Sequence, residues 1–102
     1  MKKFIATYIE DADPEYCDFE FPLDAILVLD NNGNIMTASS KNEMYELIKK
    51  EAEHYIEINN AQNPDHRIPY SNLTIYEEDM RITIEDDNGI EVVIYNIHQI
   101  EI

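Results

Sequence analysis

Several short segments alternate apolar and polar positions, which is the pattern of a β-strand with one buried face. The first such segment is 3–9 and the second is 16–21. Residues 10–15 between them hold turn formers and acids, so the two segments are expected to pair as a hairpin with a longer loop. Pro22 is expected to end the second strand or to place it at an edge of the sheet.

Two Asn-Gly pairs predict tight turns between apolar runs. Asn32-Gly33 joins two short apolar runs within residues 25–38, and Asn88-Gly89 joins the segments 80–85 and 90–100. Asn-Gly favours a type I′ turn because both central residues of that turn have positive φ. We therefore predict a hairpin at each pair.

A helix is predicted over residues 41–58, where apolar positions recur at spacings of three and four. Ser40 and Glu43 form a capping-box sequence at its start. Asn59-Asn60 is expected to supply a left-handed C-cap, and Pro64 should prevent continuation. The apolar stripe that should face the core consists of Met44, Leu47, Ile48, Ala52, Tyr55 and Ile56.

The remaining pattern completes an α+β fold. Residues 60–72 form a polar loop, and 73–76 reads as a further strand ahead of the segments 80–85 and 90–100. The last strand is expected to be central and covered on both faces, or bulged near Asn96. The expected order is ββ(ββ)αβββ: a single antiparallel (mixed) sheet of about five to seven strands with one helix packed on it. Residues 1–102 are expected to form a single domain.

The net charge of the chain gives information about its function. The chain has 22 Asp and Glu against 7 Lys and Arg, a formal net charge of −15. Such a charge opposes compaction by self-repulsion, and solubility alone is served by a net charge of about 2–8 in a small domain. The excess indicates recognition of a basic partner, with solvation alone as the alternative. Direct binding of nucleic acid or of an anionic membrane is not expected, because phosphate contacts need Lys and Arg.

The N-terminal segment and the cysteine content indicate a cytoplasmic location. Cys17 is the single cysteine, so no internal disulfide is expected, which suits a reducing compartment. The first residues lack the apolar core of a signal peptide. No apolar run reaches the roughly 18 residues of a membrane span, so no membrane association is expected.

Candidate catalytic and metal-binding motifs are weak. The segment 30–34 superficially resembles a calcium loop, but its glycine falls fourth rather than sixth. His54, His66 and His98 lack the spacing of zinc ligands. No nucleophile-elbow or phosphate-binding glycine motif is present. The sequence therefore predicts a protein that is not an enzyme and that needs neither metal nor cofactor.

The acids gather in two stretches, 10–24 and 77–91. One interpretation is that turns and solvent-facing positions are acidic because the whole chain is acidic. The functional interpretation is a negative face that steers a Lys- and Arg-rich partner and binds it through charge-assisted hydrogen bonds. The residues expected to bind this partner are Glu10, Asp11, Asp13, Glu15, Asp18, Glu20, Asp24, Glu77, Glu78, Asp79, Asp86 and Asp87, with Tyr16 and Tyr76 as aromatic anchors.

The N-terminal two-thirds resembles the HicB-type antitoxins. The similarity rests on the segment 3–13 followed by Tyr16, on Phe21-Pro22 with Asp24, on the Ser40 and Glu43 cap, and on Ile68-Pro69. The resemblance implies a partial RNase-H-like fold and a protein that neutralises a small basic mRNA interferase by covering it. The family's Pro-Gly-Cys and Gly-Asp-Thr pieces are missing, and 25–38 looks like an added hairpin. Operator binding is not expected.

Charge and resemblance together predict a non-enzymatic, antitoxin-like inhibitor of a basic nucleic-acid-acting protein. Two alternatives use the same acidic surface. One is a phage-type nucleic-acid mimic that blocks a defence nuclease, as an anti-CRISPR or anti-restriction protein does. The other is an immunity protein against a toxin. The sequence leaves the oligomeric state open, a homodimer included.

Overall fold

An antiparallel sheet with one helix across it forms the described part of the chain. The structure is a computed structural model, and it describes residues 2–10 and 26–101. The elements in chain order are β1 (Lys2–Glu10), β2 (Ile26–Leu27), α1 (Lys41–Gln62), a 3₁₀ turn (Tyr70–Asn72), β3 (Leu73–Tyr76), β4 (Arg81–Glu85) and β5 (Glu91–Glu101). Over these residues the sheet has five strands in the order β2-β1-β5-β4-β3. The predicted α+β class is confirmed, while the predicted strand 16–21 lies outside the described residues.

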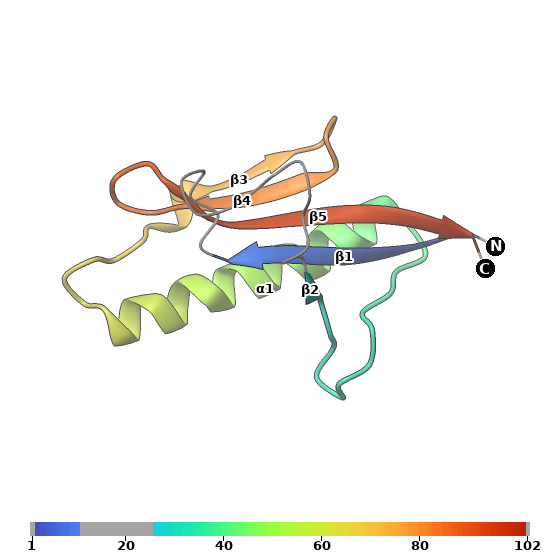
Figure 1. The fold of residues 1–102 in the computed structure, drawn as a ribbon, viewed down its shortest axis with the longest axis horizontal. Helices are drawn as coiled ribbons and strands as arrows, with labels where there is room; N and C mark the ends of the chain where they lie inside the picture. The colour runs from blue at the N-terminus through green and yellow to red at the C-terminus, as the bar shows by residue number, and fades with distance from the viewer. Residues whose placement is uncertain (1, 11–25, 102) are drawn as a thin grey trace.

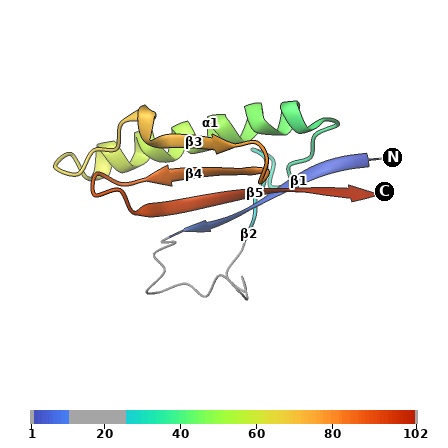
Figure 2. The ribbon, with the colours of Figure 1, turned by 90° about the horizontal axis from the view of Figure 1, so that it is seen from above.

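The central strand β5 pairs with β1 on one side and with β4 on the other (Figure 1). Helix α1 crosses one face of this sheet (Figure 2). On that face Ile82, Ile84 and Val93 are fully buried in the core. Thr83 and Ile94, which alternate with them, are also buried. The expectation of a central strand covered on both faces is thus confirmed at its middle.

The irregularity in the β4–β5 ladder is not near Asn96. The register shifts between Ile84 and Glu85, where Ile84 pairs with Val93 and Glu85 pairs with Glu91. The extra residue opposite this step is Val92, which packs against the helix-side core. The bulge therefore lies next to the β4–β5 turn.

The helix begins as predicted and ends later. Ser40 Oγ accepts a hydrogen bond from the Glu43 backbone N–H at 3.1 Å, and the Glu43 carboxylate accepts one from the Ser39 N–H at 3.3 Å. The left-handed cap expected at Asn59-Asn60 is wrong, because α1 continues to Gln62 and Asn63 caps it with φ −128°.

Asn59 and Asn60 hold the following loop instead of ending the helix. The Asn60 side chain accepts from the Ile68 N–H at 2.7 Å and donates to the Ile68 carbonyl at 3.0 Å. The Asn59 side chain donates to the His66 carbonyl at 3.2 Å. These bonds satisfy the backbone of a loop that no strand pairs with, so Asn serves here for its amide rather than for its tolerance of positive φ.

Both Asn-Gly turns form, but the type I′ geometry is wrong. Gly33 and Gly89 each have φ 80°, whereas Met80 is the one non-glycine residue of the described chain with positive φ. The Asp30 carbonyl accepts from the Gly33 N–H at 3.0 Å, and the Asp30 N–H donates to the Asn34 carbonyl at 2.8 Å. Asp30 Oδ1 also accepts from the backbone N–H groups of Asn32 and Asn34. The carboxylate thereby stabilises a turn in which only the glycine needs positive φ.

Residues 26–38 form a hairpin that projects from the edge of the sheet. Only Ile26–Leu27 forms a strand; Leu29 and Ile35 make an isolated bridge, and Ala38 returns to pair with Phe4. Figure 1 shows this hairpin extending away from the sheet edge. The hairpin predicted at Asn32-Gly33 is present, but its strand pairing is limited to short contacts. Val28, Met36 and Ala38 of this segment are buried in the core, whereas Leu29 and Ile35 are about half exposed.

No helix among the described residues has the length and apolar character that crossing a membrane requires.

Candidate functional site

The second acidic stretch does not form a single patch. Glu77, Glu78 and Asp79 lie in the β3–β4 loop, and Asp86 and Asp87 lie in the β4–β5 turn. These two loops are at opposite ends of β4. At about 3.3 Å per residue its five residues separate the loops by roughly 15 Å. The structure thus divides the stretch 77–91 into two acidic sites.

The β4–β5 turn shares its end of the molecule with the end of β1. Glu10 pairs with Val93 in the sheet register, next to the start of β5. We call this region the acidic end and define it by Glu10, Glu85, Asp86, Asp87 and Glu91. Lys2, Lys3 and Lys41 lie at the other end, where β1 and α1 begin (Figure 1). The acids Glu77, Glu78 and Asp79 of the β3–β4 loop also lie toward that other end, so carboxylates are present at both ends of the sheet.

Four of the predicted binding residues have contacts within the chain. Asp86 Oδ1 accepts from the N–H groups of Asn88 and Ile90, so this carboxylate holds its turn. Asp79 lies 3.6 Å from the Arg81 guanidinium, which also stacks 5.0 Å over the Tyr76 ring. Asp87 lies 3.3 Å from His66, an ion pair only when the histidine is protonated.

The other predicted binding residues are either exposed or lie outside the residues that the structure describes. Glu10, Glu77 and Glu78 are exposed and have no cationic partner among residues 2–10 and 26–101. The positions outside the described residues are Asp11, Asp13, Glu15, Tyr16, Asp18, Glu20 and Asp24. Of the described set, these three glutamates remain available to a partner.

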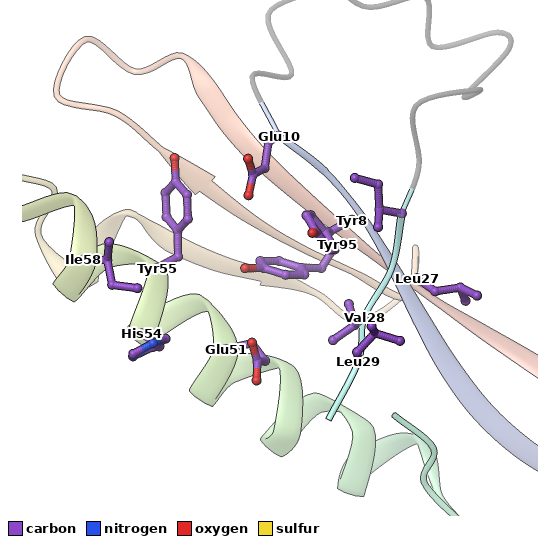
Figure 3. A pocket seen from close by; sticks show the side chains of 11 residues that line it. Tyr8, Glu10, Leu27, Val28, Leu29, Glu51, His54, Tyr55, Ile58 and Tyr95 are labelled. Atoms are coloured by element: carbon purple, nitrogen blue, oxygen red, sulfur yellow. The ribbon is translucent and has the colours of Figure 1, made fainter. Parts of the chain in front are cut away.

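Sequence reasoning missed a groove between α1 and the β1–β2 edge of the sheet (Figure 3). Its volume is about 330 Å³, within the range of about 300–1,000 Å³ of small-ligand pockets. Three tyrosines line it: Tyr8 from β1, Tyr55 from α1 and Tyr95 from β5. Ile26–Leu29 form one wall, and Glu10 and Glu51 add two carboxylates.

The groove combines aromatic rings with negative charge. Tyr8 and Tyr95 lie with ring centroids 6.1 Å apart and planes tilted by 41°. Burial raises the pKa of the Tyr95 hydroxyl above its ordinary value, and the charges of Glu51 and Glu10 raise it further. Figure 3 shows Tyr95 reaching from the sheet toward the helix, with Glu51 and Tyr55 on the helix side. A ligand in the groove would meet tyrosine hydroxyls and carboxylates together.

Apolar side chains are exposed beside this groove. Ile26 is 54% exposed, Leu29 49% and Ile35 48%. Large apolar residues scattered singly on a surface need no explanation, but these belong to one strand edge and its projecting hairpin. Leu29 and Ile35 lie opposite each other in this hairpin, and Ile26 lies in β2 at the groove wall.

A weak signal for the groove was present in the sequence. Glu51, Tyr55 and Ile58 are spaced by four and three residues, so they share one flank of α1 beside the core stripe. The contribution of Tyr8, Tyr95 and β2 depends on strand order, which no local pattern in the sequence contains.

Metal-ligating side chains do not cluster in the described part of the chain: no group of three or more His, Cys, Asp or Glu residues is placed to hold an ion. The three histidines lie apart. His54 is on α1 at the groove, His66 is in the loop after α1, and His98 on β5 lies 2.9 Å from the Thr7 hydroxyl.

Comparisons of the chain with protein families, with curated proteins and with solved structures give no match.

Proposed function

We propose that this protein is a non-enzymatic inhibitor that binds a basic, nucleic-acid-acting protein through its acidic surface. The observation that carries the proposal is the exposure of Glu10, Glu77 and Glu78, whose carboxylates have no cationic partner among residues 2–10 and 26–101. Uncompensated charges of one sign raise the encounter rate with a partner of opposite sign and disfavour partners of like sign.

The two separated acidic loops support contact with an extended basic surface rather than with a single cationic group. A partner that engaged both loops would need positive charge over roughly 15 Å, the length of β4. Proteins that act on nucleic acids carry such basic surfaces for phosphate binding. The antitoxin-like form of the proposal rests additionally on the sequence resemblance.

Affinity capture tests the proposal. Tagged protein is incubated with lysate of its source organism at low salt, and the retained proteins are identified by mass spectrometry. We expect a basic protein that acts on nucleic acid, released as salt rises because the Debye length shortens from about 10 Å at 0.1 M to about 3 Å at 1 M. A small toxin would favour the antitoxin-like role, and a defence nuclease would favour the mimic.

Matched charge variants separate a specific surface from total charge. Glu77→Gln with Glu78→Gln removes two acids of the β3–β4 loop, and Glu46→Gln with Glu53→Gln removes two from α1. Glu57 is unsuitable as a control because it accepts a hydrogen bond from Tyr70 at 2.9 Å.

We expect the loop pair to weaken binding of the captured partner about fivefold to tenfold and the helix pair to change it little. A set built from Asp11, Asp13, Glu15 and Asp18 should behave like the loop pair. Equal losses for all sets would mean that total charge alone explains binding, and the proposal of a specific surface would fail.

A further inference from the structure

The groove between α1 and the β1–β2 edge is lined by carboxylates and tyrosine rings as well as by apolar side chains. Glu10 and Glu51 border a space lined by tyrosine rings, and neither carboxylate has a cationic partner among the described residues. Carboxylates beside partly buried aromatic rings repel anions and leave a purely apolar ligand with unfavourable contacts. The complementary occupant is therefore a cation that can also pack against aromatic faces.

Resting on the proposed function, we infer that the groove receives an arginine side chain from an apolar-flanked segment of the basic partner. The planar guanidinium stacks on aromatic rings and donates paired hydrogen bonds to carboxylates, which a lysine ammonium does less well. Tyr8 and Tyr55, both partly exposed, offer the rings, and Glu10 and Glu51 offer the acceptors.

The flanks of the groove define what lies next to that arginine. Ile26 and Leu29 are about half exposed at 54% and 49% and form the wall nearest the projecting hairpin. Their burial would favour a segment with apolar residues beside the arginine. A second copy of this chain is a less suitable occupant, because bringing together two molecules of net charge −15 is opposed by repulsion.

A peptide titration followed by NMR tests the assignment on the full chain. The probe is acetyl-Leu-Arg-Leu-amide, and its control carries citrulline, which keeps the shape of arginine but has no charge. We expect saturable amide shifts at residues 26–29 and 51–58 with the arginine peptide, and much weaker binding of the citrulline peptide.

Substitutions locate the binding site independently of the shifts. Glu51→Gln removes a groove carboxylate, and Glu46→Gln removes an exposed carboxylate from the same helix outside the groove. We expect Glu51→Gln to weaken the arginine peptide about threefold to tenfold and Glu46→Gln to leave it nearly unchanged. Equal binding of the citrulline peptide, or equal losses in the two variants, would overturn the assignment.

The remaining outcomes separate this inference from the proposed function. Peptide shifts confined to residues 77–79 and 86–87 would overturn the groove assignment while supporting a basic partner on the acidic loops. Shifts at 26–29 that depend on protein concentration without peptide would overturn it in favour of a second copy. A titration without any shift would also overturn the groove assignment, and the capture experiment would still decide the proposed function.

Discussion

The chain builds the same turn twice, at 30–34 and at 86–90, and places the two copies in different surroundings. In each turn an aspartate carbonyl accepts from the glycine N–H, and its Oδ1 accepts two backbone N–H groups. The turn at 86–90 joins β4 to β5 within the sheet. The turn at 30–34 ends a hairpin that has one bridge, Leu29 with Ile35, both about half exposed.

This difference separates the cause of turn formation, which is local, from the burial of the residues that flank the turn. The Asp-x-Asn-Gly sequence determines the turn in both places, because its hydrogen bonds are local. The residues that flank the turns differ in burial: Ile84 and Val93 beside one turn are fully buried, whereas beside the other Val28 and Met36 are buried and Leu29 and Ile35 are about half exposed.

The largest expected contrast is between apolar residues that flank the two turns. Ile84→Ala removes a fully buried side chain, and we expect the free energy of unfolding to fall by about 2–5 kcal/mol. Ile35→Ala, at 48% exposure, should change it by less than about 0.5 kcal/mol. Urea denaturation measures both. A comparable loss for the two variants would mean that the projecting hairpin is part of the cooperative core.

The glycines provide a smaller contrast. No atom lies within 4 Å of a Cβ added at Gly33 or Gly89, so the cost of valine comes from its φ of 80° and not from a clash. Gly89→Val should destabilise the protein by about 1–3 kcal/mol. Gly33→Val should cost less than about 1 kcal/mol, because the projecting hairpin can rearrange locally without unfolding the sheet. Thermal midpoints test this order, and its reversal would refute the comparison.

The aspartates provide the smallest contrast. Asp86→Ala removes an acceptor of two backbone N–H groups and should cost about 1 kcal/mol, while Asp86→Asn keeps an oxygen acceptor and should cost less. Asp30→Ala should show little global effect but faster amide exchange at residues 32 and 34. Unchanged exchange at those amides would argue against the side-chain bonds in the first turn.

Local patterns predicted much of this fold. The helix start at Ser40, the strands β1, β3, β4 and β5, and the central place of β5 follow from periodicity and capping. The turn geometry and the helix end were predicted wrongly for one shared reason. In each case Asn was interpreted by its own propensity, whereas side-chain hydrogen bonds at Asp30, Asp86 and Asn60 determined the outcome.

The candidate site was less accessible to sequence reasoning. The stretch 77–91 is continuous in sequence, yet the five residues of β4 divide its acids between two ends of the sheet. The groove forms where Tyr8, Tyr95 and β2 lie beside one flank of α1, and these segments are distant in the sequence. Strand order is a property of the whole core, so local spacing could not predict the groove.

The rate of association with the captured basic partner, measured from 0.1 to 1 M salt, tests the central claim most directly. If the exposed carboxylates steer that partner, the association rate should fall at least about tenfold over this range. The loop variant Glu77→Gln with Glu78→Gln should show a shallower salt dependence than the helix variant Glu46→Gln with Glu53→Gln. An association rate that does not change with salt would contradict the account, because the acidic surface would then play no part in recognition.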